Sequence, residues 1–334
     1  MKEAEIYELA ATGVCRNEPL KGKVIETHIS WIILSKRNAF KIKKPLQLSF
    51  LDFSTLAKRK EYCERELQLN SRFSDIYISV VPVGLLENKY YLDGKAGKVI
   101  DYAVQMKRMM GAKKMDKLLE EGKVDDKNIL SLAKKIASFH QNSEIITSPF
   151  NFNVACNTFN DILTVKDFIK EHLGEKFYKI ILESITWSDT FLAKHQDRFQ
   201  ERIALGYKRD VHGDLHSGNI FLYKKPVLFD CIEFDDKYRQ IDVLYEIAFL
   251  CMDLESFNEK ALAQRFLAEY LSYFNCIKNK EDEAIFIYFK SLRANIRAKV
   301  RTISALQAGD TRSRKKYLSE INKYLLKMYE YTKM

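Results

Sequence analysis

Long apolar runs are absent from this 334-residue sequence, and so are the marks of a secreted or repetitive protein. No run reaches the roughly 18 apolar residues that a membrane-spanning helix needs. The start of the chain, Met1 to Glu8, carries too many charges for a secretory signal peptide. There is no internal repeat, no low-complexity linker and no Cys-x-x-Cys pair among the six scattered cysteines. We therefore expect a cytoplasmic protein with reduced thiols.

The length and the residue pattern predict two lobes of different character. At 334 residues with 46% apolar side chains, the chain is long enough for two domains and a large core. β-Branched and aromatic segments predict strands at 24–30, 31–34, 39–43, 76–81, 90–92 and 100–106, with one helix at 54–73. Helical patterns follow at 113–121, 126–142, 161–183, 187–203, 240–255, 258–275, 281–307 and 312–331, with short strands at 220–223 and 227–229. This order predicts an α+β, bilobal fold with an antiparallel-sheet N-lobe (1–106) and a largely helical C-lobe (107–334).

The segment around Asp214 gives the strongest functional signal. Asn219 follows Asp214 by five residues, and Asp230 follows it by sixteen at the end of an apolar run. Phosphoryl-transfer enzymes need this set, because one carboxylate takes the proton of the acceptor hydroxyl while an amide and a second carboxylate hold the magnesium ion that bridges the phosphates. We assign Asp214 as the base and Asn219 and Asp230 as metal ligands. Glu233 is a residue that supports the metal ligands, a further metal ligand, or a surface residue.

Two histidines in the same segment allow another interpretation. His212 and His216 are four residues apart, and Cys231 follows. A zinc site is disfavoured, because no fourth ligand is evident and a loop does not fix this spacing as a helix would. His212 is better explained as a structural residue of the loop, where Gly213 supplies a backbone conformation closed to other residues.

The motif has a recognisable form. Protein kinases read His-Arg-Asp where this chain has His212-Gly213-Asp214. The His-Gly-Asp form, with Asp-x-x-Glu at 230–233, resembles the aminoglycoside phosphotransferase and choline kinase branch of the protein-kinase-like fold. From about residue 25 to 305 the chain is similar to an uncharacterised bacterial aminoglycoside-phosphotransferase-like family, some members of which carry an added C-terminal P-loop kinase domain. The motifs that carry this resemblance lie at 28–31, 39–45, 50–56, 80–83, 212–220, 229–234 and 248–255.

The resemblance implies a kinase-like fold that uses ATP and Mg²⁺, but it does not imply aminoglycoside substrates. Two departures stand out. The chain has no Gly-x-Gly-x-x-Gly, so the backbone of the turn His28–Ser30 and the Ser30 side chain would have to cover the phosphates. It also has no Gly-x-x-x-x-Gly-Lys-Ser/Thr motif, so we expect this sequence to lack the P-loop domain. The hinge that contacts the nucleotide would lie at Gln105, Met106 and Lys107, and Asp242 would support the catalytic loop.

Lys41 and Glu66 are the predicted nucleotide clamp. Lys41 ends the Ala-x-Lys of the strand at 39–43, whose lysine in kinases holds the α- and β-phosphates and pairs with a glutamate on the next helix. On a projection of that helix, Glu66 falls inside the apolar arc, where a carboxylate is costly unless it is paired. Lys43 shares the face of Lys41 and is the alternative clamp. Arg59 lies in the same arc and is an alternative partner for Glu66, while Glu61 and Glu64 fall outside it.

The positive charge is concentrated at the C-terminal end. From Lys290 onward there are twelve Lys and Arg against three acids, which accounts for +9 of the net +10. Arg293, Arg297 and Arg301 continue from Lys290 as a stripe beside an apolar face that Phe289, Leu292, Ile296, Val300 and Ile303 are expected to form. In the fold that the chain resembles, C-lobe helices line the acceptor pocket. A cationic stripe there favours a small anionic acceptor.

These features of the sequence are compatible with three functions. An ATP- and Mg²⁺-dependent phosphotransferase is preferred. A non-catalytic nucleotide-binding module is disfavoured, because a module that only binds needs no base. A nucleic-acid-associated protein rests on the basic C-terminal segment alone, and the stripe has no interleaved aromatic residues. The sequence does not name the acceptor, choose between ATP and GTP, or set the oligomeric state.

Overall fold

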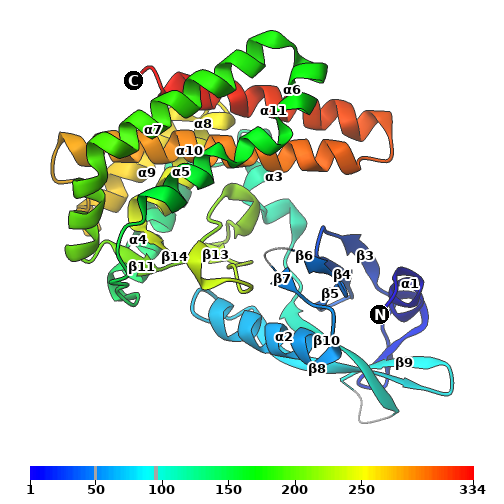
Figure 1. Ribbon diagram of the computed structural model, residues 1–334. Coiled ribbons are helices and arrows are strands. Elements are labelled where there is room, and N and C mark those ends of the chain that lie inside the picture. Colours follow the sequence, from blue (N-terminus) through cyan, green and yellow to red (C-terminus); the bar gives the residue numbers. More distant parts are fainter. Residues whose placement is uncertain (49–50, 94–96) are drawn as a thin grey trace. The chain divides into compact units, whose positions relative to one another are not determined.

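The computed structural model describes residues 1–48, 51–93 and 97–334, which form two compact units (Figure 1). The first unit comprises Met1–Lys117 and Asn219–Tyr238, and the second comprises Leu118–Gly218 and Arg239–Met334. The segment that carries Asn219 and Asp230 therefore packs with the N-terminal part of the chain. The first residue of the expected motif at 50–56, Phe50, lies outside the described residues.

The first unit is built on an eight-stranded sheet in the order β2-β1-β9-β8-β10-β5-β4-β3. Its neighbouring strands run antiparallel except for β1 and β9, which are parallel, so the sheet is mixed rather than purely antiparallel as predicted. The parallel pair arises because β1 belongs to an N-terminal extension that the sequence did not reveal as strand. The strands are β1 (Val14–Cys15), β2 (Glu18–Pro19), β3 (Lys23–Glu26), β4 (Ser30–Leu34), β5 (Asn38–Lys43), β8 (Tyr77–Leu86), β9 (Lys89–Leu92) and β10 (Lys98–Lys107).

Two helices pack against the sheet, and each contributes to its own apolar cluster (Figure 1). Because side chains alternate along a strand, Phe40 and Ile42 of β5 join a cluster with Ile6 and Leu9 of α1 (Glu3–Thr12). Ala39 joins the cluster that contains Cys63 of α2 (Leu56–Asn70). Lys41 and Lys43 share the face of Ala39 and are consequently directed toward α2. Two small hairpins complete the unit: β6 (Gln47–Leu48) with β7 (Leu51–Asp52), and β12 (Ile220–Phe221) with β13 (Val227–Leu228).

The second unit is helical apart from a two-stranded ladder of β11 (Lys208–Asp210) and β14 (Gln240–Asp242). The chain enters it through α3 (Met115–Glu120), and α10 and α11 form an antiparallel hairpin that packs on α8 (Figure 1). Its helices are α4 (Asp126–Asn142), α5 (Phe152–Asn160), α6 (Lys166–Leu173), α7 (Glu175–Ala204), α8 (Val243–Ser256), α9 (Lys260–Tyr273), α10 (Lys280–Gln307) and α11 (Thr311–Tyr331). None of the helices in the described ranges is long and apolar enough to cross a membrane.

Several predicted elements differ from the structure, among them the helix predicted at 240–255, whose first residues form β14 before α8 begins at Val243. The predicted helices 161–183 and 187–203 are divided elsewhere, because the chain breaks at Gly174, which has φ of +90°, and α7 then continues without interruption to Ala204. The helices α1 and α5 were not predicted. The predicted strand 24–30 is shorter, since β3 ends at Glu26 and a turn precedes Ser30.

Candidate active site

Two buried lysines of β5 converge on one glutamate of α2. Lys41 Nζ lies 2.8 Å from Glu66 Oε1, and Lys43 Nζ lies 2.8 Å from Glu66 Oε2. Glu66 is fully buried, as its place in the apolar arc predicted. The expected pairing of Lys41 with Glu66 is confirmed, but Lys43 is an additional partner rather than an alternative one. The other suggested partner, Arg59, pairs with Asp101 at 2.8 Å.

Opposite charges keep this buried cluster ionised. Burial alone would favour neutral Glu66, but the ammonium groups of Lys41 and Lys43 overcome it and lower its pKa to about 2. Burial likewise disfavours charged Lys41, yet Asp230 and Glu66 hold the pKa of Lys41 well above its usual value. Each charge therefore depends on its neighbours, and removal of one would leave another buried without compensation.

Asp230 joins the same cluster from the segment that returns to the first unit. Its Oδ1 lies 2.6 Å from Lys41 Nζ, and its side chain is 47% exposed. Asp230 has φ of +64°, a left-handed conformation that is uncommon for a residue other than glycine and costs about 1–3 kcal/mol. Its backbone N–H donates to the Tyr77 hydroxyl at 3.0 Å. The backbone is thus held so that a partly exposed carboxylate lies beside a buried lysine.

Asn219 is brought close to Asp230 by the β12–β13 hairpin. The pairing of Ile220 with Leu228 is extended by the backbone of Asn219, whose carbonyl accepts the N–H of Phe229 at 3.2 Å. An amide and a carboxylate are oxygen donors of the kind that Mg²⁺ takes, together with waters and phosphate oxygens. These residues fit a magnesium–nucleotide ligand. In the described part of the chain no group of three or more His, Cys, Asp or Glu side chains could hold a metal ion unaided.

Glu233 is less accessible than Asp230. Its side chain is 4% exposed and pairs with Lys43. Burial raises the pKa of Glu233, against the opposing effect of the Lys43 ammonium. Of the alternatives that the sequence left open for Glu233, the surface position is wrong, and the supporting role and the metal-ligand role remain.

In the second unit, the loop before and after Asp214 is tied to two helices. The backbone N–H of Gly213 donates to Glu246 Oε1 of α8 at 2.6 Å, and Arg293 of α10 donates to the Gly213 carbonyl at 2.9 Å. Ser217 donates its backbone N–H to Asp253 Oδ2 of α8 at 2.8 Å. Gly213 has φ of +85°, a conformation that glycine adopts without strain. Asp214 therefore lies on a loop whose neighbouring peptides are fixed.

Glu246, which accepts the Gly213 N–H, is itself in contact with other buried side chains. Glu246 Oε2 lies 2.7 Å from His140 Nε2, and His140 Nδ1 lies 2.7 Å from the Tyr270 hydroxyl. His140 lowers the pKa of Glu246 against the effect of burial. His212 accepts the backbone N–H of Asp214 at 3.4 Å, consistent with the predicted structural role. These contacts make Glu246 an anionic anchor for the loop.

Among the described residues, the support that the sequence assigned to Asp242 comes instead from Glu246. Asp242 accepts two hydrogen bonds from the buried guanidinium of Arg202, at 2.7 and 2.9 Å, and caps the start of α8 through the N–H of Leu244. Glu246 lies one helical turn further along α8. The sequence signal for Glu246 is a carboxylate in an otherwise apolar run, Val243 to Met252.

Asp214 lies among positive charges. Its side chain is 39% exposed, with His216 Nε2 at 3.5 Å. Desolvation opposes ionisation of Asp214, but His216, Arg293 and Arg297 together hold its pKa well below its ordinary value. Asp214 consequently remains an anionic hydrogen-bond acceptor at neutral pH.

The basic stripe on α10 divides into two kinds of residue. Lys290 pairs with Glu255 at 2.7 Å, and Arg301 pairs with Glu320 at 2.6 Å, so their charges are compensated. Arg293 stacks on Tyr245 at 3.9 Å, and the Nε atoms of Arg293 and Arg297 are buried without a hydrogen-bond partner among the described residues.

The apolar face predicted beside this stripe is only partly present. Val300 is 38% exposed and Ile303 is 36% exposed, so the expectation that both are buried is wrong. The buried positions in this part of α10 are Ala298, Thr302, Ser304 and Ala305, because α11 packs against this helix. Small residues allow the two helices to approach, and the pattern of large apolar side chains therefore misplaced the face.

The predicted nucleotide turn and hinge have definite positions. The Ser30 hydroxyl is buried and has no hydrogen-bond partner among the described residues. Gln105, Met106 and Lys107 belong to β10, a central strand, and the Lys107 N–H already donates to Ile76 O at 2.8 Å. The connecting backbone that leaves the sheet begins at Arg108. The contacts of these residues with a nucleotide stay predictions.

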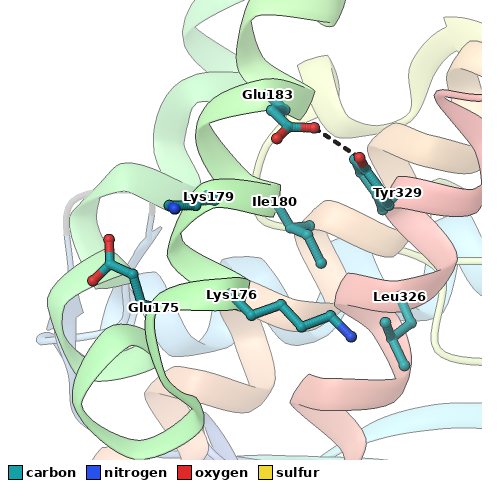
Figure 2. Close-up of a pocket in the computed structure, with 7 residues that line it drawn as sticks. All are labelled: Glu175, Lys176, Lys179, Ile180, Glu183, Leu326 and Tyr329. Carbon is teal, nitrogen blue, oxygen red and sulfur yellow. Dashed lines mark hydrogen bonds between the residues drawn. The ribbon is translucent and has the colours of Figure 1, made fainter.

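One open hollow lies on the second unit, along α7 and α11 (Figure 2). On its rim Tyr329 donates its hydroxyl to Glu183 at 2.7 Å. Its lining contains no predicted site residue, so it is separate from the candidate site. The lining residues are Glu175, Lys176, Lys179, Ile180, Glu183, Leu326 and Tyr329.

Comparison with known proteins supports the fold. No protein-family model matches the chain. The uncharacterized protein Rv2004c of Mycobacterium tuberculosis is 28% identical over 307 residues, covering 87% of this chain, and the chain spans 57% of that relative's length. A choline kinase from Cryptosporidium parvum has a TM-score of 0.55 at 13% identity, over 92% of this chain and 89% of that one.

Two further solved structures have a similar fold. A choline/ethanolamine kinase family protein from Mesorhizobium loti has a TM-score of 0.54 at 10% identity, over 98% of this chain and 99% of that one. The GDP and kanamycin complex of APH(2")-IIia has a TM-score of 0.51 at 13% identity, over 97% and 98%. The chain has the protein-kinase-like fold that choline/ethanolamine kinases and aminoglycoside phosphotransferases share.

Proposed function

We propose that this protein is a cytoplasmic, ATP- and Mg²⁺-dependent phosphotransferase that moves the γ-phosphate to a hydroxyl of a small anionic acceptor. The observation that carries the proposal is the contact of Lys41 with both buried Glu66 and the partly exposed Asp230. A purely structural ion pair would not require a strained backbone at Asp230. The structural neighbours are small-molecule kinases, which favours phosphotransfer as the reaction class. The six free cysteines accord with a reducing compartment.

Each residue has a role that follows from its surroundings. Lys41, oriented by Glu66, would hold the α- and β-phosphates, and Asn219 and Asp230 would hold Mg²⁺, which supplies charge neutralisation when bound. Asp214 would accept a hydrogen bond from the acceptor hydroxyl, orient its oxygen and take its proton as the bond to phosphorus forms. Its lowered pKa favours the orienting role, because a weakly basic carboxylate takes the proton late.

The anionic nature of the acceptor rests on Arg293 and Arg297. Both lie close enough to Asp214 to lower its pKa, and each has a buried Nε without a partner among the described residues. An acceptor whose hydroxyl lies at Asp214 would bring a carboxylate or phosphate within reach of these guanidinium groups. A polycationic acceptor would meet like charge there.

The test is ATP consumption by the full chain with Mg²⁺, screened against phosphorylated, carboxylated, neutral and cationic hydroxyl compounds. We expect turnover with members of the anionic group and none in the Asp214→Asn variant. Turnover confined to neutral or cationic compounds would remove the anionic acceptor from the proposal. ATP binding without turnover of any compound would favour a nucleotide-binding module.

A further inference from the structure

The second lysine of β5 has no part in the function proposed above, although it is the more deeply buried of the two. Lys43 is fully buried and lies between two carboxylates, with Glu66 Oε2 at 2.8 Å and Glu233 as its other partner. Its ammonium group also lies 4.8 Å from the centre of the Phe53 ring. Burying an ammonium group in this way is costly and requires charged partners.

The cluster joins three segments that are distant in sequence. Glu66 comes from α2, the lysines come from β5, and Asp230 and Glu233 come from the segment that follows β13. Each oxygen of Glu66 is taken by a different lysine. Lys41 thereby connects Glu66 to Asp230, and Lys43 connects Glu66 to Glu233.

Exposure separates the roles of the two carboxylates. The Asp230 side chain is 47% exposed, whereas the Glu233 side chain is 4% exposed and pairs with Lys43. A bound magnesium ion keeps several waters and phosphate oxygens around it. The exposed carboxylate of Asp230 could hold such an ion, whereas Glu233 would first have to give up its pair with Lys43.

We infer that Lys43 and Glu233 are positioning residues for the nucleotide site: Lys43 holds Glu66 for Lys41, and Glu233 anchors the segment of Asp230 without binding the metal. The expected effect on nucleotide binding rests on the proposed function. The ion pair between Lys43 and Glu233 is independent of that function. Without Lys43, both oxygens of Glu66 would compete for Lys41, which would draw that ammonium group away from the phosphates. Without the Glu233 carboxylate, the segment of Asp230 would lose its ion pair with Lys43 of β5.

The experiment compares Lys43→Met, Glu233→Gln and the double variant in the full chain. Glu233→Gln is the variant best able to fold, because Lys41 and Lys43 then face Glu66 and Asp230 with balanced charge. Lys60→Met and Glu64→Gln serve as matched controls, because these residues form an exposed ion pair on α2, the helix that carries Glu66. Lys60 Nζ lies 3.7 Å from Glu64 Oε1. Three quantities are measured for each: stability to denaturant without nucleotide, the Kd of ATP at saturating Mg²⁺, and the Mg²⁺ concentration that gives half-saturation at fixed ATP.

We expect each single variant to weaken ATP binding about tenfold, with the double variant no weaker than the worse single one. The Mg²⁺ half-saturation should stay within about twofold of the wild type, and the controls should change none of the three quantities by more than about twofold. An unchanged ATP Kd in both single variants would overturn the positioning role. A tenfold rise in Mg²⁺ half-saturation for Glu233→Gln alone would make Glu233 a metal ligand.

Failure of the proposed function gives a different result. A wild-type chain that binds no ATP would overturn the phosphotransferase assignment and the nucleotide part of this inference. The stability measurements would then decide whether Lys43 and Glu233 act together, and additive losses of stability in the double variant would overturn the pairing as well.

Discussion

Gly213 donates its backbone N–H to Glu246 Oε1 at 2.6 Å, and this bond fixes the peptide between His212 and Gly213, one residue before Asp214. Glu246 is 1% exposed and is itself held by His140, so the anchor has little freedom to move. A buried carboxylate that accepts a backbone N–H is worth more than a neutral hydrogen bond. The orientation of the proposed base thus depends on a residue of α8 that need not touch the substrate.

Replacement of Glu246 by Ala should lower kcat by about tenfold or more, since a hydrogen bond to a charged group contributes about 1.5–3 kcal/mol. Glu246→Gln keeps an acceptor for Gly213 and should lose less. The KM for ATP should change little in both, because the nucleotide residues Lys41 and Asp230 belong to the first unit. Steady-state kinetics of the two variants checks this, and equal losses of kcat in Gln and Ala would argue against the bond to Gly213.

Asp214→Asn should reduce phosphoryl transfer by about 10²- to 10⁴-fold while ATP binding persists. The carboxylate acts on the acceptor hydroxyl, whereas Asn219 and Asp230 still hold the metal. Single-turnover transfer and equilibrium ATP binding separate the two effects. Near-normal turnover with the true acceptor would show that Asp214 is not the base.

Lys41 and Glu66 should be energetically coupled. Lys41→Met and Glu66→Gln should each raise the KM for ATP and lower the free energy of unfolding, and the double variant should lose less than the sum. A coupling of about 1–3 kcal/mol is expected for a buried pair. Denaturant unfolding of the four proteins gives it directly. A coupling of zero would mean that Lys43, without Lys41, compensates the charge of Glu66.

These residues show which parts of the site could be predicted from the sequence. The spacing of Asp214, Asn219 and Asp230 predicts their roles, and the place of Glu66 in an apolar arc predicts its burial, because both are local patterns. The roles of Lys43 and Glu246 depend on which distant segments come together, and one sequence does not contain that information. The same limit explains Val300 and Ile303, whose exposure is set by where α11 packs.

Acid should destabilise the protein through Glu66. Its pKa is lowered in the folded chain to about 2 from an ordinary value of 4.5. Between these values the unfolded chain binds more protons, so the contribution of Glu66 is present above about pH 4.5 and is lost as the pH falls toward 2. The free energy of unfolding should therefore decline less steeply over this range in Glu66→Gln than in the wild type. The exposed residue Glu64 supplies the control, and a slope unchanged in Glu66→Gln but altered in Glu64→Gln would contradict the assignment.

Charge reversal at Arg297 should raise the KM of the acceptor at least about tenfold and the KM of ATP little. The physical reason is that Arg293 and Arg297 have the unpartnered Nε atoms near Asp214, whereas Lys290 and Arg301 are compensated by Glu255 and Glu320. The KM of the acceptor should also rise with salt, because partly exposed ion pairs are screened within about 8–10 Å at moderate ionic strength. Arg312→Glu, at an exposed position near the start of α11, is the matched control and should leave both constants unchanged. An acceptor KM that is indifferent to both Arg297→Glu and salt would mean that these arginines serve only to keep Asp214 ionised and the loop at Gly213 in place.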